Sequence, residues 1–357
     1  MSRTAKAYLS TEHLIHNVQV IRRQAPSSSI IAMVKANAYG HGIRSVSKRI
    51  EHLVEMFGVA SIDEAVSLRK VGITKPIILM EGIFEREELE LACQNNCHVV
   101  FHSHYQVAWL ESQRLSQNIH AWIKLDSGMG RLGFDSSMMK SIYDRLVRHV
   151  NVNPKVRILS HLACSSDKDH SMNQEQLSVF DQTMSVFSTE YSLCNTSAIF
   201  HFPEYQLDFV RPGIALLGIG PDQNLKPVMT LKAQLIAVKH LKKGQSVGYN
   251  AKYRCPKDMR VGVVSLGYGD GYPQQAPCST PTWLQGTICP LVGQVSMDML
   301  TIDLSSCPGA GVGQWVTLWG DKLPISIVAK HCQSTAYELM TRVQHRVKFE
   351  WTDTVNV

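Results

Sequence analysis

A lysine stands at the end of an apolar run in the stretch "AMVKANAYGHG", residues 32–42. The run before Lys35 is short, branched and apolar, which predicts a buried strand, and the residues after it are turn formers. Removing a lysine from water lowers its pKa, and a neutral lysine amine is a nucleophile that can form a Schiff base. The alternative is a solvated lysine at a strand end, so the choice depends on what else the fold brings to this place.

Residues able to bind a ligand also stand at or just after the ends of later apolar runs. They are Lys124, Arg131, His161, Asn195, Thr196, Arg211, Gly213 and Ile214. Taken singly, His161 is most simply interpreted as a structural histidine. The corresponding alternative for Lys124 is a salt bridge to a nearby carboxylate. If the runs are strands of one parallel barrel, two lysines, two arginines and a histidine share its mouth, which favours a functional site.

The elements that must position these residues alternate between strand and helix over the first two-thirds of the chain. Apolar runs predict strands at 29–35, 57–61, 76–80, 98–102, 119–125, 156–161, 191–194 and 207–211. Segments of helical period, such as 61–72, 86–96 and 173–187, lie between them. Eight such units predict an α/β fold with an N-terminal (β/α)8 barrel of the TIM type, with an open doubly wound sheet as the alternative.

The predicted barrel suggests a cofactor. In this fold the loops after strands seven and eight often form a phosphate site, and "CNTS" and "RPGI" occupy those loops here. A lysine opposite a phosphate site suggests pyridoxal phosphate, with its aldehyde on the lysine and its phosphate in the loops.

The pattern changes near residue 226, where strand-like runs cut by glycine turns replace the alternation. We therefore predict a cofactor-binding barrel domain at 1–225 and a mostly-β C-terminal domain at 226–357, with a short helical segment at 334–343. The first ten or so residues are predicted to contain a strand that could join the β-domain. A helix capped by Ser10 or Thr11 would follow it.

Composition argues against several other classes of protein. The chain has 357 residues, 44% of them hydrophobic, and a formal net charge of +6. Its basic residues are dispersed, so no nucleic-acid partner is predicted, and no apolar run is long enough to span a membrane. The start lacks the apolar core of a signal peptide, and the nine irregularly spaced cysteines are expected to be free thiols in a reducing cytoplasm. No His and Cys set stands at metal-binding spacing, so no metal is predicted.

Long stretches of the chain, in order and without large gaps, resemble the alanine racemase family of pyridoxal-phosphate enzymes. These are "AMVKANAYGHG", "IKLDSGMGRLGF", "LSHLACSSD", "VRPGIALLG", "VGYNAKY", "VSLGYGDGY" and "VGQVSMDMLTIDL". The resemblance implies a barrel followed by a β-domain. It also implies an enzyme that interconverts L-alanine and D-alanine, supplying D-alanine for bacterial peptidoglycan.

The resemblance further implies roles for individual residues. Lys35 would carry the cofactor in a Schiff base and act as one proton-transfer base on the substrate's own Schiff base. Tyr249 would be the second base and would reach in from the partner subunit of a homodimer, so that the two active sites are shared. The cofactor would also be held by Tyr39, Arg131, His161, Asn195, Thr196, Arg211, Gly213 and Ile214.

Substrate contacts are implied in the same way. Arg131 and the backbone N–H of Met297, beside Asp298, would bind the substrate carboxylate, and Tyr268 would narrow the entrance. In some family members the lysine matching Lys124 is carbamylated, which here would create an anion that orients Arg131.

Several positions depart from the family pattern. Asn250 follows the expected catalytic tyrosine where glycine is common, and Gln294 stands where an arginine is common. His345 stands where some members have a tyrosine, and residues 216–218 read "LLG" where many members read "LYG". These departures leave the expected chemistry intact but bear on pocket detail and substrate breadth.

Three alternatives to an alanine racemase stay open at this point. One is a serine or broad-specificity racemase of the same fold. The second is a pyridoxal-phosphate carrier without turnover, against which the β-domain residues argue, because such carriers resemble the barrel alone. The third is a barrel hydrolase that uses Lys124 and His161, which would not explain the other motifs.

Overall fold

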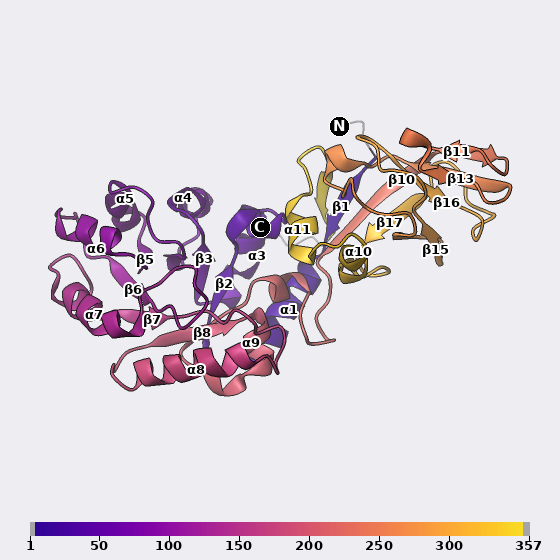
Figure 1. The fold of residues 1–357 in the computed structure, drawn as a ribbon. Helices are drawn as coiled ribbons and strands as arrows, with labels where there is room; N and C mark the ends of the chain where they lie inside the picture. Colours follow the sequence, from indigo (N-terminus) through magenta and orange to yellow (C-terminus); the bar gives the residue numbers. More distant parts are fainter. Residues whose placement is uncertain (1–3, 353–357) are drawn as a thin grey trace. The chain divides into compact units, whose positions relative to one another are not determined.

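The computed structural model describes residues 4–352, which form two compact units (Figure 1). Within the described residues, one unit comprises 14–38 and 42–225 and is called the barrel unit here. The other comprises 4–13, 39–41 and 226–352 and is called the β unit.

Eight parallel strands close into the barrel in the order β2 to β9. They are β2 (Ser29–Met33), β3 (Met56–Val59), β4 (Ile77–Leu79), β5 (Cys97–Phe101), β6 (His120–Lys124), β7 (Arg157–Leu159), β8 (Tyr191–Asn195) and β9 (Phe209–Arg211). Closure comes from β2 pairing with β9, with Ser29 opposite Phe209. The (β/α)8 barrel predicted from the sequence is therefore confirmed, and the open sheet is excluded.

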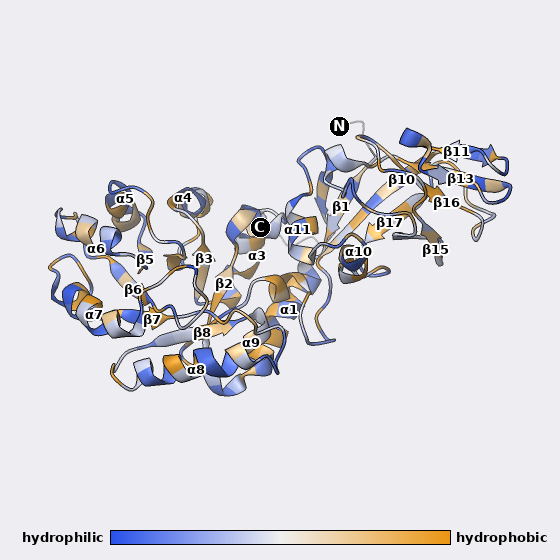
Figure 2. Cartoon of the chain, in the orientation of Figure 1, coloured by the Kyte–Doolittle hydropathy of each residue, from blue (hydrophilic) through white to orange (hydrophobic). Residues whose placement is uncertain are grey.

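Helices surround the barrel strands, because each strand must be followed by a return to the same end of the sheet. They are α1 (Thr11–Gln24), α3 (Ile43–Ile50), α4 (Ile62–Lys70), α5 (Glu88–Gln94), α6 (His104–Glu111), α7 (Met139–Arg148), α8 (Ser171–Met184) and α9 (Thr196–His201). Figure 2 shows that α7 and α8 each carry apolar and polar faces, as expected for helices packed on a sheet. The Ser10 hydroxyl accepts the N–H of His13 at 3.1 Å, so Ser10 caps α1.

Most of the strands are shorter than the sequence predicts. The first was expected to run to Lys35 but ends at Met33, and the eighth begins at Phe209 rather than 207. The apolar pattern continues past the last paired residue because loop residues such as Val34 are also buried. Burial and strand pairing therefore end at different residues.

The β unit is built on an eight-stranded sheet with the path β15-β14-β17-β10-β1-β18, and with β13 joining β10 to β16. Its strands are β1 (Lys6–Leu9), β10 (Met229–Leu241), β13 (Met259–Val264), β14 (Pro281–Leu284), β15 (Thr287–Pro290), β16 (Leu300–Asp303), β17 (Trp315–Trp319) and β18 (Lys348–Trp351). A small hairpin, β11 (Ser246–Val247) with β12 (Tyr253–Arg254), and the helices α10 (Ile325–His331) and α11 (Ala336–Thr341) complete it. Strand β1 lies between β10 and β18, so the start of the chain belongs to this sheet.

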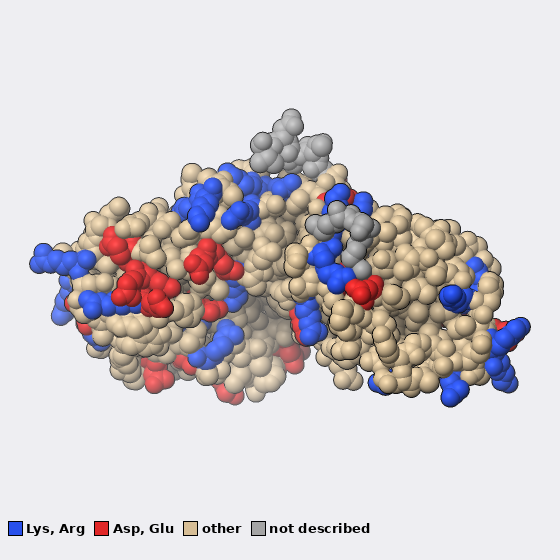
Figure 3. Space-filling view, turned by 90° about the horizontal axis from the view of Figure 1, so that it is seen from above, with Lys and Arg blue, Asp and Glu red and all other residues tan. Residues whose placement is uncertain are grey.

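Charged side chains of both signs are interspersed over the face drawn in Figure 3. None of the nine cysteines, all of which lie among residues 4–352, is in a disulfide, as the sequence predicts. No helix within residues 4–352 combines the length and the apolar character needed to cross a membrane.

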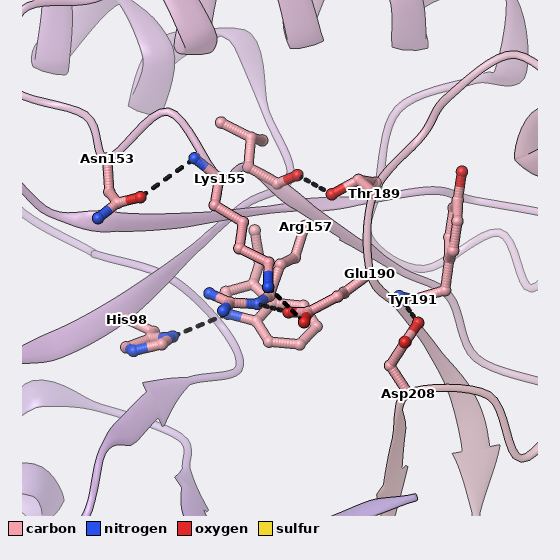
Figure 4. A network of polar contacts seen from close by, with 10 residues as sticks. His98, Asn153, Lys155, Arg157, Thr189, Glu190, Tyr191 and Asp208 are labelled. Carbon is pink, nitrogen blue, oxygen red and sulfur yellow. Dashed lines mark hydrogen bonds and ion pairs between the residues drawn. The ribbon is translucent and has the colours of Figure 1, made fainter.

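A polar network closes the end of the barrel where the strands begin (Figure 4). Lys155 and Arg157 both contact the carboxylate of Glu190, and Arg157 Nε lies 2.6 Å from its Oε2. The Arg157 guanidinium also lies over the Trp122 ring, at 5.5 Å from its centroid. The Trp122 indole donates to Nδ1 of His98, 3.1 Å away. Charge pairing and aromatic stacking therefore fasten this end and leave the opposite end for chemistry.

Histidines buried in the barrel unit stay neutral when the chain is folded. Burial, with the nearby His120 and Arg157, lowers the pKa of His98 to about 2, and burial lowers the pKa of His120 and His102 as well. An unfolded chain protonates its histidines below a pH of about 6.5. Protons therefore favour the unfolded state, and the stability present above that pH is lost as the pH falls.

Replacing His98 should reduce the acid sensitivity of folding. His98→Gln keeps an acceptor for the Trp122 indole but removes one group that protonates only on unfolding. Between about pH 6.5 and 5.5, the free energy of unfolding should fall by about 1 kcal/mol less in the variant than in the wild type. Urea unfolding at several pH values measures this, with His52→Gln, at an exposed histidine, as the control. Parallel pH profiles for wild type and His98→Gln would contradict the argument.

Candidate active site

Most of the barrel residues singled out from the sequence lie at the ends of the strands, as expected. Lys124, Asn195 and Arg211 are the last residues of β6, β8 and β9. Lys35 and His161 each follow the end of their strand, β2 or β7, by two residues. Because the barrel is closed and parallel, these side chains share one end of it.

Lys35 opens a left-handed turn. The four residues that follow it, Ala36, Asn37, Ala38 and Tyr39, have φ angles of 51°, 56°, 51° and 50°. None is glycine, and left-handed backbone costs an L-residue roughly 1–2 kcal/mol. Consecutive strained residues persist only where the surroundings hold them, and such strain tends to mark functional sites.

Side chains hold this turn. The Glu64 carboxylate on α4 accepts the N–H of Ala36 at 2.7 Å and the N–H of Ala60 at 2.9 Å. The Asn37 side chain accepts the N–H of Ile43, at the start of α3, at 2.9 Å. Each of these contacts satisfies a backbone donor that ordinary secondary structure does not. Together they fix the exit of the chain from Lys35.

The far end of the turn belongs to the β unit. The ring of Tyr39 lies 5.8 Å from that of Tyr337 on α11. Gly40 has a φ of 83°, and a Cβ there would lie 2.2 Å from the carbonyl oxygen of Met340. Tyr39 and the lysine therefore end up in different units, although only three residues separate them.

Arg211 is buried and held by neutral oxygens. Its Nη1 donates to Ser192 Oγ at 2.6 Å, and its Nη2 donates to the carbonyls of Ser160 at 2.5 Å and Leu193 at 3.1 Å. Burial lowers its pKa to about 10, so it remains a cation at neutral pH. Among residues 4–352 no ion pair gives it a carboxylate partner. A buried cation held this way is suited to donate to a ligand.

Positive charge accumulates around Arg211. Its Nη2 lies 3.4 Å from Nδ1 of His161, and burial together with Arg211, Lys124, Arg131 and Lys35 lowers the pKa of His161 to about 3. The imidazole is therefore neutral. Lys124 is only 6% exposed, and burial, then Arg211, Arg131 and Lys35, lower its pKa to about 8.

Arg131 is placed by a glycine-rich loop after β6. The Asp126 carboxylate accepts the N–H groups of Gly128 at 2.9 Å and Gly130 at 3.1 Å. Gly133 has a φ of 131°, and a Cβ there would lie 2.6 Å from the backbone nitrogen of Asp126. The loop is therefore compact at its base, while Arg131 itself is exposed.

The loops after β8 and β9 meet at Thr196. Its hydroxyl accepts the N–H of Gly213 at 3.0 Å and that of Ala215 at 3.4 Å. Both acceptor positions of the oxygen are thus used, which leaves its hydrogen free to donate. Asn195 caps α9 by accepting the N–H of Ala198 at 3.1 Å. Ile214 opens the short 3-10 helix Ile214–Leu217. The Thr196 hydroxyl and the N–H at the start of this helix are donors that suit an anion such as a phosphate.

Tyr268 and Met297, predicted in separate motifs, lie together in the β unit. The N–H of Tyr268 donates to Ser296 O at 3.0 Å, and that of Gly269 donates to Met297 O at 2.8 Å. Arg346 fastens both loops, because it pairs with Asp298 and, through Nε at 3.0 Å, with the buried Asp270.

Tyr249 begins a strained 3-10 turn (Tyr249–Ala251) and is 67% exposed. Asn250, which replaces the family's common glycine, has a φ of 59°, a conformation that asparagine tolerates better than most residues. Its side chain donates to Oε1 of Gln294 at 3.3 Å. Two of the four departures noted in the sequence therefore contact each other.

Sequence reasoning missed several residues that shape this site. Glu81 lies 3.4 Å from Nζ of Lys35, Glu64 holds the left-handed turn, and Arg346 fastens the Tyr268 loop. Glu81 could have been found by the rule that identified Lys35, since it follows the third predicted strand, 76–80. Glu64 and Arg346 lie in or near helices and carry no local signal.

Family models match almost the whole chain. The alanine racemase N-terminal domain matches residues 9–221, and the alanine racemase C-terminal domain matches residues 228–351. This chain belongs to the alanine racemase family. Family membership accounts for the barrel followed by a β-domain, as the resemblance implied.

Individual relatives agree. The chain is 41% identical to an alanine racemase of Vibrio parahaemolyticus over 98% of this chain and 99% of that one. It is 39% identical to one from Coxiella burnetii, over 97% and 98%. Among solved structures, the biosynthetic alanine racemase from Pseudomonas aeruginosa superposes with a TM-score of 0.95 at 37% identity, covering 98% of this chain and all of that one.

A further solved relative carries a cofactor. The alanine racemase from Bartonella henselae with covalently bound pyridoxal phosphate superposes with a TM-score of 0.90 at 27% identity, over 98% of this chain and 99% of that one. The comparison places an enzyme of this family, with that cofactor attached, on nearly the same backbone.

Because its pKa is lowered, Lys124 is expected to react with carbon dioxide. With a pKa of about 8, roughly a quarter of the side chains are neutral amines at pH 7.5. A neutral amine can add to carbon dioxide, and the resulting carbamate anion would be stabilised by Arg131 and Arg211. We expect a carbamate signal in ¹³C NMR of the protein in labelled bicarbonate at about pH 8, and its loss in Lys124→Met. A spectrum that does not differ between the two proteins would exclude the modification.

Proposed function

We propose that this protein is an alanine racemase that interconverts L-alanine and D-alanine with pyridoxal phosphate bound to Lys35. The observation that carries the proposal is the shared barrel end, which gathers Lys35, the buried Arg211 and the Thr196 hydroxyl. Membership of the family and relatives of about 40% identity over the full chain support the choice of reaction.

The residues present fit pyridoxal phosphate. Lys35 would bond its aldehyde, Thr196 with Gly213, Ile214, Asn195 and Tyr39 would hold its phosphate, and Arg131 would contact its phenolic oxygen. When bound, the cofactor supplies an electron-withdrawing ring that makes the α-proton of the amino acid acidic. The Thr196 hydroxyl, with both acceptor positions filled, is left as a donor for a phosphate oxygen.

Arg211 favours racemisation over other reactions of this cofactor. A guanidinium with a pKa of about 10 keeps its protons, so it would donate to the pyridine nitrogen without protonating it. His161, neutral and adjacent, supports the orientation of Arg211 without adding a charge. The ring would then withdraw electrons less strongly, which disfavours side reactions such as transamination. A decarboxylase of similar fold would need a carboxylate at this position.

Two bases on opposite faces of the substrate would move the proton. Racemisation removes the α-proton from one face and returns a proton to the other, which a lysine and a tyrosine can do between them. We assign these roles to Lys35 and Tyr249, with Arg131 and the N–H of Met297 binding the substrate carboxylate and Tyr268 at the entrance.

The exposure of Tyr249 supports a homodimer with shared sites. A phenol that is 67% exposed cannot work as a shielded base, and Met297 and Met299 in the β unit are 53% and 40% exposed. A second subunit that covers this surface would shield the tyrosine and bury the methionines. We propose that Tyr249 of one subunit serves the barrel of the other.

A cytoplasmic role in supplying D-alanine for peptidoglycan follows from this activity. The superposed Pseudomonas aeruginosa relative is described as biosynthetic, which supports the same role here. The substrate and cofactor are both small soluble molecules, consistent with work in the cytoplasm.

Proton NMR in heavy water tests the activity directly. The purified protein with L-alanine should lose the α-proton signal while a chiral assay detects D-alanine in matching amount. In Tyr249→Phe, racemisation should fall by more than about 100-fold, because one general acid–base group is lost, while one enantiomer still exchanges its α-proton. Retained cofactor without exchange of alanine or other amino acids would instead identify a carrier.

A mixing experiment tests the shared sites. Lys35→Ala and Tyr249→Phe chains should each be inactive, but random mixing makes half of the dimers mixed, each with one intact site. About a quarter of wild-type activity should return. As the matched control, wild type exchanged with a Lys35→Ala/Tyr249→Phe chain should fall to the same level, because its mixed dimers have no intact site. No recovery on mixing would mean that each chain completes its own site.

A further inference from the structure

Lys35 has a carboxylate partner that the proposed mechanism does not use. Oε1 of Glu81 lies 3.4 Å from Nζ of Lys35. The two side chains are 39% and 37% exposed, so the pair lies partly out of water. Glu81 follows β4 by two residues, as Lys35 follows β2, and both therefore belong to the same end of the barrel.

The loop that carries Glu81 is built to hold it in place. Gly82 has a φ of 71°, and a Cβ there would lie 2.4 Å from Val100 O and 2.5 Å from Nε2 of Gln106. Such crowding means that the chain after Glu81 passes directly against β5 and α6. Only glycine fits this position, so the loop has one available path.

A buried amide and an imidazole complete the support. Gln106, which is fully buried, donates through Nε2 to Ile83 O at 3.1 Å and accepts the N–H of His102 at 2.9 Å. Nε2 of His102 lies 3.0 Å from the carbonyl oxygen of Glu81. Burial lowers the pKa of His102, so the ring is neutral and donates this hydrogen bond from Nε2. The backbone on both sides of the carboxylate is thus fixed by one network.

The cations around Lys35 explain why a carboxylate beside it is useful. Lys35 contributes to the lowered pKa of Lys124 on β6 and of His161 after β7, and Arg131 and Arg211 act on the same two groups. The acidic groups next to the lysine are Glu81 and Glu64, and Glu64 is occupied with backbone N–H groups. Asp126, in the loop after β6, acts on Lys124. Glu81 is therefore the counter-charge that directly contacts the Lys35 ammonium.

We propose that Glu81 is a positioning residue for Lys35, holding its amine at the barrel mouth and favouring its charged form. The inference rests on the proposed attachment of pyridoxal phosphate to Lys35. Attachment requires the neutral amine: its lone pair adds to the aldehyde carbon, and water leaves as the carbon–nitrogen double bond forms. Glu81 would thus set the pH range in which Lys35 reacts, and a proton leaving Lys35 has an acceptor within reach.

The test measures the rate of cofactor attachment instead of turnover. Protein stripped of cofactor is mixed with pyridoxal phosphate over a range of pH, and the attached fraction is fixed by borohydride reduction and mapped by mass spectrometry. The proteins compared are wild type, Glu81→Gln, Glu81→Asp and Glu85→Gln. Glu85 is an exposed carboxylate four residues along the same segment, so its variant makes the same change of charge without touching Lys35.

We expect the negative charge of Glu81 to affect the rate of cofactor attachment more than its hydrogen bond to Lys35 does. In Glu81→Gln the pH–rate profile should move about half a pH unit lower, giving roughly threefold faster attachment on its acid side, because an opposite charge near the partly exposed ammonium is gone. Glu81→Asp should stay close to the wild-type profile, and Glu85→Gln should match it.

Two results would overturn the inference. One is a Glu81→Gln profile that superimposes on that of wild type, and the other is slower attachment with an unshifted profile, which would reduce Glu81 to a loop-shaping residue. Either result leaves the proposed function intact if the wild-type cofactor maps to Lys35. A wild-type cofactor that maps to another residue would refute the role of Lys35 and the inference with it.

Discussion

Cations at one end of the barrel repel one another, and the other groups of the site are arranged to offset this repulsion. A closed parallel barrel gathers its strand ends, and here the ends carry Lys35, Lys124, Arg131 and Arg211. Like charges in a partly buried place destabilise one another unless something offsets them. The protein offsets them locally, with neutral oxygens on Arg211, a neutral His161, a partly neutral Lys124 and the Glu81 carboxylate. A doubly anionic phosphate and a substrate carboxylate would complete the balance, which explains why the cations are tolerated.

The same barrel explains why the opposite end looks different. There the cations Lys155 and Arg157 are paired with Glu190, and the guanidinium lies over an aromatic ring (Figure 4). Paired charge at the start of the strands needs no ligand, whereas at their ends the buried Arg211 has no carboxylate partner among residues 4–352 and can donate to a ligand. The contrast between the two ends identifies the functional one without reference to relatives.

The left-handed turn after Lys35 is the second constraint. Four residues at positive φ cost several kcal/mol in total if each costs roughly 1–2 kcal/mol, and this strain must be offset by contacts. Glu64 and the Asn37 side chain provide them by satisfying three backbone N–H groups. The turn lets the chain leave the barrel strand at Lys35 and reach the packing partner of Gly40 in the β unit within five residues. The same turn therefore places Lys35 and carries the chain from the barrel unit into the β unit.

Much of this could be predicted from the sequence, because strand runs and their ends are local signals. The order of eight apolar runs gave the barrel, and the residues after them gave the cation-rich end. The left-handed turn was not predictable, since "ANAY" contains no glycine to mark positive φ. The pairing of β1 with β18 joins residues more than 300 positions apart, and Glu64 and Arg346 act on distant loops. Such contacts depend on the folded path and leave no local pattern.

The departures from the family pattern show how a local signal can mislead when read one position at a time. Asn250 and Gln294 looked like two separate losses, of a glycine and of an arginine. In the structure they share a hydrogen bond across the turn that presents Tyr249. A φ of 59° favours glycine and, after it, residues such as asparagine, which adds an amide that glycine lacks. That amide is a donor, and a glutamine oxygen can accept from it whereas an arginine offers no acceptor. The two departures are therefore chemically linked, next to a proposed catalytic phenol that is 67% exposed.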